Sequence, residues 1–396
     1  MINGTDAHNA PPAVKSRRFI TIVTIGHFFN DGAANFLPGV LPLVLVAIGQ
    51  PLSLAGVLMG ALALGQICQP LIGWLADTRG GRAYVPLGLL MTSVGGGLVP
   101  ITQNLGQLIA VLLLVSLGSA LYHPPSLALV RSETVKDARN SGFYMAIFFV
   151  GGELGRGFWP TIASIVTVTL GYEYLWLIVI PGLLWLPILF RHMPVLPRKQ
   201  AQQRVEHARR PLLAPVASLI SFRVVLSFST VAASAYIPAL WYLNGGSTVG
   251  GAALITAMIT VGAFGNIIGG SIADRFGLKN VLYSSFICIA VLSVAYTFTH
   301  GVWSFVIAAM LGMAIFFPST TAVMIGQDIF PNSATMGTGI ALGLAGGIGA
   351  LCLILIGAVI SDAQIVLVFY LVGILALAAL VVVYFMPLSR QHDART

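Results

Sequence analysis

Long apolar segments separated by short polar stretches recur along the whole sequence. Cutting the chain at turn residues and charge clusters gives twelve segments, which begin near residues 19, 53, 82, 106, 138, 173, 213, 248, 279, 302, 333 and 364. Segments of about 20 apolar residues match the length of an α-helix that crosses a bilayer. Because backbone groups in lipid need partners within the protein, the pattern predicts an all-α integral membrane protein with twelve transmembrane helices.

The composition supports the same class. Hydrophobic residues make up 57% of the 396 residues and charged residues only 8%, and the mean hydropathy of +0.92 lies far outside the range of soluble globular domains. The first 18 residues lack the apolar core of a signal peptide, so we expect a short tail there. Cys68, Cys288 and Cys352 stand alone in apolar segments, so we expect free thiols, no metal set and no cofactor.

A polar linker and an internal repeat divide the chain into two halves. The longest internal polar stretch runs from Arg191 to Pro211. We therefore expect an N-terminal tail (1–18), a six-helix bundle (19–190), a linker (191–212), a second six-helix bundle (213–386) and a C-terminal tail (387–396). GWLADTRGGR (73–82) aligns with GSIADRFGLK (270–279) at an offset of 197 residues. Two such repeats facing each other could enclose a cavity that opens to either side.

The basic residues predict the orientation of the chain. Lys and Arg near helix ends stay on the cytoplasmic side, and with the N-terminus inside, 18 of the 20 basic residues fall in cytoplasmic segments. We therefore expect both termini in the cytoplasm and the protein in the inner membrane. The formal net charge of +8 then reflects topology and contact with anionic lipid, and nucleic acid is not an expected partner.

The repeated loop motif resembles a known family signature. The pattern G-x-x-x-D-x-x-G-x-[RK] occurs after the second and the eighth segments, and its residues are Gly73, Asp77, Gly80, Arg82, Gly270, Asp274, Gly277 and Lys279. It resembles the signature of the major facilitator superfamily, which implies twelve helices in two repeats and loop acids that hold the outward-facing state. An ordinary surface salt bridge is the alternative, but occurrence in both halves favours the gating role.

A narrower resemblance concerns three short stretches. HFFND (27–31), YHP (122–124) and VGGELG (150–155) are similar to the fosmidomycin-resistance branch of that family, whose members are drug exporters. This chain differs from the branch at Glu153 and Arg156, where small or amide side chains are usual.

The first apolar segment contains polar side chains at positions within the membrane, where burying a polar group costs free energy. His27 and Asp31 are four positions apart, and Asn30 lies beside them, so on a helix the three share a face. An acid at this depth is a functional candidate by default. We expect Asp31 to bind the coupling proton and His27 to share it, with Asn30 contacting substrate. The alternative is that these polar side chains only form hydrogen bonds that fix contacts between helices.

Other polar residues lie in later segments. Glu153 and Arg156 could neutralise each other, or Glu153 could be a second titrating acid while Arg156 binds a carboxylate or phosphonate. Arg223 could bind an anion or extend to the cytoplasmic surface. Tyr122 and His123 precede two prolines, which free backbone carbonyls and bend the helix, so both could contact substrate or serve only the kink.

The sequence as a whole predicts a proton-coupled secondary transporter that exports a small organic compound by alternating access. No phosphate-binding loop for ATP appears in the sequence, and no nucleophile, base or metal set has workable spacing for an enzyme. We expect a monomer whose partners are protons, a small molecule and lipid. The alternatives are an uptake symporter for a small organic anion and a non-transporting sensor or scaffold.

Overall fold

The computed structural model describes residues 13–134, 141–195, 213–330 and 337–386, and regular structure within these ranges is helical. The first half contains α1 (Ala13–Asn35), α2 (Leu41–Ala47), α3 (Ala55–Leu64), α4 (Gln69–Arg79), α5 (Tyr84–Leu98), α6 (Leu105–Thr134), α7 (Ser141–Leu170) and α8 (Ile180–His192). The second contains α9 (Leu213–Leu243), α10 (Thr248–Phe276), α11 (Leu278–Tyr296), α12 (Val302–Phe316), α13 (Ser319–Ile329), α15 (Ala345–Gly357) and α16 (Ile365–Phe385).

Short 3-10 and π-helical turns join or extend several of these helices. The 3-10 turns are η2 (Leu37–Gly39), η3 (Leu52–Leu54), η4 (Gly65–Cys68), η5 (Val99–Ile101), η7 (Tyr172–Val179) and η9 (Asp362–Gln364), and η8 (Gly339–Leu344) is π-helical. Proline explains some of the breaks, because it lacks the N–H that the next helical turn needs. Pro38 and Pro42 lie where α1 gives way to η2 and α2.

Within the described residues, ten continuous helical stretches are long and apolar enough to cross a membrane. They are Leu52–Ala76, Tyr84–Ile101, Leu105–Val130, Tyr172–His192, Leu213–Leu243, Thr248–Ala273, Leu278–Tyr296, Val302–Ile329, Gly339–Gly357 and Asp362–Phe385. The two other long helices, α1 with 23 residues and α7 with 30, contain GHFFNDG and GGELGRG. Polar residues lower the hydropathy of both. The structure thus confirms the all-helical membrane fold.

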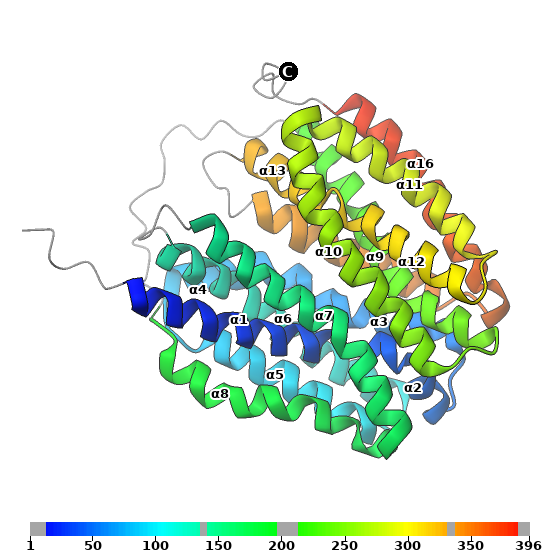
Figure 1. Ribbon diagram of the computed structural model, residues 1–396, viewed down its shortest axis with the longest axis horizontal. Coiled ribbons are helices and arrows are strands. Elements are labelled where there is room, and N and C mark those ends of the chain that lie inside the picture. Colours follow the sequence, from blue (N-terminus) through cyan, green and yellow to red (C-terminus); the bar gives the residue numbers. More distant parts are fainter. Residues whose placement is uncertain (1–12, 135–140, 196–212, 331–336, 387–396) are drawn as a thin grey trace, which may run out of the picture.

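The helices of each half pack mainly with one another (Figure 1). In the first half α1 lies along α7, and α5 lies along α6; in the second, α10 packs against α12, and α11 against α16. The halves meet mainly where α3 packs against α15 and α7 packs against α10, and α3 also contacts α9, while α4 and η4 contact η8. The long helix α7 therefore contacts both α1 and the second half.

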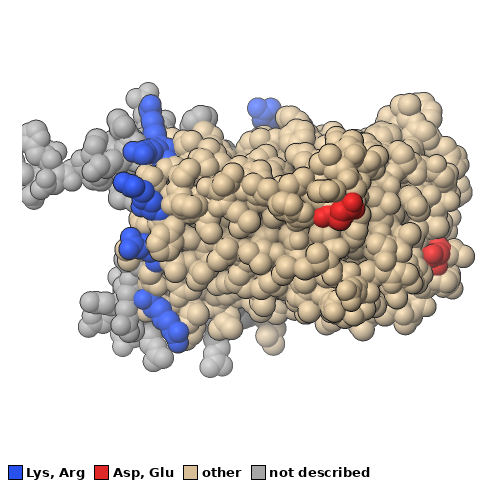
Figure 2. Space-filling model, turned by 90° about the horizontal axis from the view of Figure 1, so that it is seen from below, with Lys and Arg blue, Asp and Glu red and all other residues tan. Residues whose placement is uncertain are grey.

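Charge is unevenly distributed between the two ends of the bundle. Exposed basic residues lie where α1 begins and where α4, α8 and α10 end; they are Arg17, Arg18, Arg79, Arg82, Arg191 and Arg275. Figure 2 shows most of the visible Lys and Arg at one end of the molecule and the visible Asp and Glu toward the other. We call the end where α1 begins the basic end and the other the opposite end.

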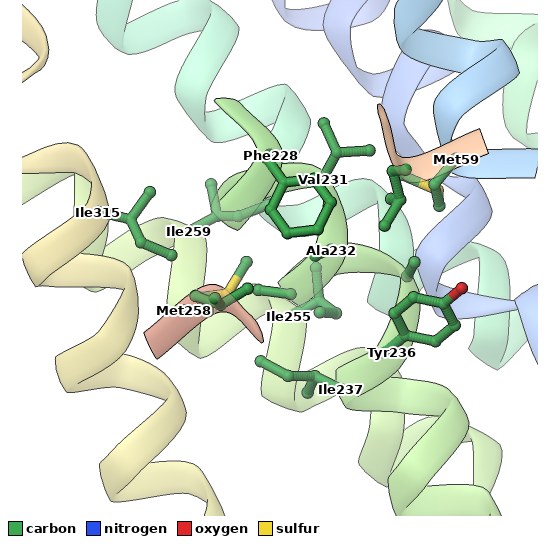
Figure 3. Close-up of a cluster of buried hydrophobic side chains, with 14 of the residues drawn as sticks. Met59, Phe228, Val231, Ala232, Tyr236, Ile237, Ile255, Met258, Ile259 and Ile315 are labelled. Carbon is green, nitrogen blue, oxygen red and sulfur yellow. The ribbon is translucent and has the colours of Figure 1, made fainter. Parts of the chain in front are cut away.

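The apolar core joins the two halves away from the basic end. One continuous cluster of buried residues includes side chains of α3, α9, α10, α12 and α16. Figure 3 shows part of it, with Met59 of α3 and with Phe228, Val231 and Tyr236 of α9. A separate cluster at the basic end contains residues of the first half alone, such as Phe19, Val23, Val130 and Leu189. The part of the shared cluster that the first half contributes therefore lies toward the opposite end, and α4 and η4 also contact η8 of the second half.

The two copies of the loop motif adopt matching structures. Gly80 and Gly277 end α4 and α10 with φ angles of 66° and 85°, a conformation that glycine adopts without steric cost. Arg82 then lies 5.7 Å over the Phe190 ring of α8, and Lys279 Nζ donates to Tyr384 O of α16 at 3.3 Å.

The motif's remaining glycines also occupy matching places. A Cβ on Gly73 would contact Pro124 of α6, and one on Gly270 would contact Thr320 of α13. The side chains of Asp77 and Asp274 lie outside the described part of the structure, so the gating role of these acids stays a prediction.

Candidate functional site

Helix α1 holds three polar side chains inside the first half. His27 is 3% exposed, Asn30 0% and Asp31 4%. The spacing in GHFFNDG places His27 Nε2 within 3.4 Å of Asp31 Oδ2, one helical turn away. The sequence prediction that these residues share one face is correct.

Helix α6 adds His123 to this group. Its Nε2 atom lies 3.2 Å from Asp31 Oδ1 and 3.3 Å from His27 Nε2. The side chain of His123 is 22% exposed, compared with 4% and 6% for His27 and Asp31. We call His27, Asp31 and His123 the polar triad; its ligand-capable atoms all lie within 4.8 Å of one another.

Backbone carbonyls fix the orientation of both imidazole rings. His27 Nδ1 lies 2.8 Å from Phe148 O of α7, and His123 Nδ1 lies 2.8 Å from Ser119 O on its own helix. A carbonyl oxygen can only accept, so each Nδ1 carries the proton and donates. Both Nε2 atoms therefore turn toward Asp31, as acceptors when the rings are neutral.

Asn30 also binds the carboxylate of Asp31. Its Nδ2 donates to Asp31 Oδ1 at 3.0 Å, and its Oδ1 accepts from Thr92 Oγ1 of α5 at 3.1 Å. Both ends of its buried amide thus bind protein groups and connect Asp31 to Thr92. The predicted contact of Asn30 with substrate stays a prediction.

Aromatic packing and glycine bring α6 and α7 close to the triad. The His27 ring stacks on Phe148, with centroids 4.2 Å apart, and on Tyr122, with centroids 5.8 Å apart. Tyr122 is fully buried and donates its hydroxyl to Val23 O of α1 at 3.0 Å. A Cβ on Gly152 would overlap the His27 ring, so this glycine permits the close approach of α7. Tyr122 thus joins α6 to α1, and its predicted contact with substrate stays untested.

Glu153 and Arg156 face each other on α7. Arg156 Nη1 lies 3.5 Å from Glu153 Oε1, and their side chains are 29% and 25% exposed for Arg156 and Glu153 respectively. Glu153 Oε2 and Arg156 Nε are buried without a hydrogen-bond partner among the described residues. Arg156 also interacts electrostatically with Asp31 and His123. The pair is therefore neutral as a unit, has unused hydrogen-bonding capacity and lies next to the triad.

Arg223 lies in the second half, apart from the triad in sequence. It is 9% exposed, and its Nε donates to Ala341 O, in the π-helical stretch η8, at 2.8 Å. The structure thus places this guanidinium inside the second half and does not extend it to the surface. This bond accounts for one of the five N–H groups of the guanidinium.

Among the described residues, four hydrogen bonds connect the two halves toward the opposite end. Asp362 Oδ1 accepts from Ser53 N at 2.6 Å, and Tyr236 donates its hydroxyl to Ser53 O at 2.9 Å. Thr256 of α10 donates to Gly157 O of α7 at 2.7 Å, and its hydroxyl also lies 2.7 Å from that of Thr161. These residues were not identified from the sequence; for Ser53, Thr161, Tyr236 and Thr256 the reason is that single hydroxyl groups in apolar segments carry no signal.

Comparisons with known proteins agree on the family and the fold. The model of the Major Facilitator Superfamily matches residues 23–351. The Fosmidomycin resistance protein of Escherichia coli (strain K12) is 23% identical over 389 residues, which are 94% of this chain and 93% of that protein. The uncharacterized MFS-type transporter YfnC of Bacillus subtilis (strain 168) is 23% identical over 357 residues, 87% of each chain.

Solved structures show the same fold at low identity. A mutant form of the nucleoside transporter NupG aligns with a TM-score of 0.72 and 16% identity, covering 93% of this chain and 99% of that one. A bacterial homolog of the human lysosomal transporter Spinster, in an inward-facing and occupied conformation, aligns with a TM-score of 0.70 and 16% identity, covering 95% of each chain.

Proposed function

Because the chain belongs to the major facilitator superfamily and is a multi-pass membrane transporter, we propose that it exports a small organic compound in exchange for protons. The polar triad is the proton-binding site, and the Glu153–Arg156 pair and Arg223 contact the substrate. The comparisons indicate no enzyme family. The protein lies in the inner membrane with the basic end and both termini in the cytoplasm, as the positive-inside rule requires.

The hydrogen bonding of the triad carries this proposal. Both Nδ1 atoms donate to carbonyls, so the neutral rings direct two lone pairs toward a carboxylate and toward each other at 3.2–3.4 Å. Without a proton between them, these hydrogen-bond acceptors would repel one another, especially where water is scarce. At least one proton must therefore be shared among the three groups. When the triad loses this proton, its net charge becomes negative, and when it gains a second proton, its net charge becomes positive.

The contacts between the halves support alternating access. The four hydrogen bonds between them, and the first half's part of their shared apolar core, lie toward the opposite end, whereas the second apolar cluster, at the basic end, belongs to the first half alone. We infer that this conformation is closed to the outside. A change in protonation of the triad would act on α7 directly, because His27 is bonded to Phe148 O, and α7 packs against α10.

The substrate class follows from the charged groups and from one relative. Guanidinium groups bind carboxylates and phosphonates through two parallel hydrogen bonds, and within the described part of the chain Arg223 and Arg156 both retain unused donors. The relative named for fosmidomycin resistance supports export of a drug-like anion. The same arginines also favour the second candidate, an uptake symporter of a small organic anion.

Proton release from everted membrane vesicles tests this function. Vesicles energised to an acid interior and loaded with a pH-sensitive dye receive fosmidomycin and other small organic anions in turn. We expect one compound to release protons from vesicles with the wild-type protein, but not from those with Asp31→Asn. The control Glu173→Gln changes an exposed acid in η7 and should behave as wild type.

Two outcomes would contradict the proposal. If compounds bind but move no protons, the coupling is wrong. If Asp31→Asn releases protons as the wild type does, the site is wrong. Substrate-driven proton movement in the same direction as a labelled anion, seen in counterflow, would select the uptake symporter.

A further inference from the structure

We propose that the polar triad is also a binding site for a divalent transition-metal ion with the coordination preferences of Zn²⁺. Two imidazole nitrogens and one carboxylate would hold the ion, and one coordination position would stay free for a water molecule or an anionic oxygen. The inference uses the same residues as the proposed function but does not depend on proton coupling.

The three ligand residues converge closely enough to hold one tetrahedral zinc ion. Zinc lies about 2.0–2.1 Å from nitrogen and oxygen ligands, so two ligands of a regular tetrahedron are about 3.3–3.4 Å apart. The two imidazole nitrogens are 3.3 Å apart, His123 Nε2 lies 3.2 Å from Asp31 Oδ1, and His27 Nε2 lies 3.4 Å from Asp31 Oδ2. Each nitrogen thus faces a different carboxylate oxygen, and ligand atoms taken one from each residue lie within 4.8 Å of one another. A modest rotation of the carboxylate would bring one of its oxygens and both nitrogens to the spacing of one face of a coordination tetrahedron.

The protonation pattern of the rings suits a metal ion equally well. A histidine that binds a metal usually donates its other ring N–H to a carbonyl or a carboxylate, which fixes the ring and its free nitrogen. Phe148 O and Ser119 O accept from the two Nδ1 atoms, and both Nε2 atoms are left for the ion. Asn30 Nδ2 binds the carboxylate of Asp31. All three ligands are thus oriented by a second layer of hydrogen bonds.

The ligand set selects the kind of metal. Two imidazoles and one carboxylate suit Zn²⁺ and its first-row neighbours, whereas Ca²⁺ and Mg²⁺ prefer oxygen ligands alone. Three protein ligands with an open position are typical of sites that exchange water or substrate, while structural zinc sites use four. The partial exposure of His123, 22%, indicates the side from which an ion would enter.

Charge also favours a cation here. Asp31 is the only carboxylate in the triad, and a divalent ion would replace the proton that the converging acceptors otherwise need. The neighbouring Glu153 and Arg156 face each other as an ion pair, so their charges largely cancel at the site. A bound Zn²⁺ would leave one positive charge, which an anionic oxygen in the open position would neutralise.

Metal titration of the purified full-length protein tests the inference. Chelator-treated protein in detergent is titrated with Zn²⁺ by calorimetry and with Co²⁺ by visible absorption, because tetrahedral Co²⁺ absorbs strongly. We expect one ion per chain and a tetrahedral Co²⁺ spectrum. The variants His27→Gln, Asp31→Asn and His123→Gln should each lower the affinity at least tenfold, and His192→Gln, which changes a histidine at the end of α8, should not.

Three results would overturn it. They are no saturable binding, an octahedral Co²⁺ spectrum in the wild type, or equal affinity in wild type and the three triad variants. The wild-type spectrum decides the question even if a variant fails to fold. The metal inference and the proposed function can fail separately, because compound-driven proton release is measured without metal and zinc binding without a compound.

Discussion

The contact between Ser53 and Asp362 allows the closure of the opposite end to be tested quantitatively. Ser53 N donates to Asp362 Oδ1 at 2.6 Å, and the two residues belong to different halves. If the halves separate here during transport, this bond exists only in the closed state. Replacing Asp362 with alanine should therefore shift the equilibrium toward the state open at this end.

The size of the shift follows from the nature of the bond. Hydrogen bonds to a charged group contribute about 1.5–3 kcal/mol, and the partial exposure of Asp362 places this one near the lower limit. A loss of about 1.4 kcal/mol changes an equilibrium constant about tenfold. Asp362→Asn keeps a neutral acceptor and should shift the equilibrium by a smaller factor than Asp362→Ala.

Distances between spin labels provide the assay. Labels at Gln50 and Val359, in the turns next to the bond, report the separation of the halves by pulsed electron resonance, in a background that lacks Cys68, Cys288 and Cys352. Ser361→Ala is the matched control, because the Ser361 side chain caps its own turn within the second half. A distance distribution in Asp362→Ala equal to that of the control would refute the reasoning.

Three further substitutions test other parts of the account. Thr92→Val keeps the side-chain shape but removes the donor to Asn30; we expect a folded protein whose compound-driven proton release falls about fivefold, the effect of about 1 kcal/mol, in the vesicle assay. Gly155→Val places a Cβ against the Phe28 backbone and should destabilise the protein by about 1–3 kcal/mol, seen as a lower melting temperature in detergent. Arg223→Met should weaken binding of anionic compounds roughly tenfold, the loss of a charged hydrogen bond, and spare neutral ones in direct binding assays.

Much of the fold could be predicted from the sequence because lipid restricts the choice of structure. Apolar segments of bilayer length must be helical, and the predicted starts agree with the observed helices to within a few residues where the structure describes them. Helix α1 begins at Ala13 and not near residue 19, since helices can extend beyond the apolar layer. The two motif glycines Gly80 and Gly277 both have positive φ, which is consistent with a repeated loop motif.

The site could be predicted only in part. The four-residue spacing of His27 and Asp31 fixes their shared helical face, but His123 is 92 positions away from Asp31 in the sequence. Helix packing, which no local pattern records, brings it to the carboxylate. We expected no metal site because no set of ligand residues has suitable spacing along the chain. The triad does not follow such a spacing because its residues come from two helices. Thr92 carried no signal, because a lone hydroxyl in an apolar helix usually bonds to its own backbone.

Proton release from the purified protein tests the central claim most directly. Protein in weakly buffered detergent solution, without a membrane or a gradient, is mixed with a compound identified in the vesicle assay, and the change in bulk pH is recorded. We predict that binding to wild type releases protons and that binding to Asp31→Asn releases none. Equal proton release by wild type and Asp31→Asn, with equal binding of the compound, would contradict the assignment of the coupling site to the polar triad.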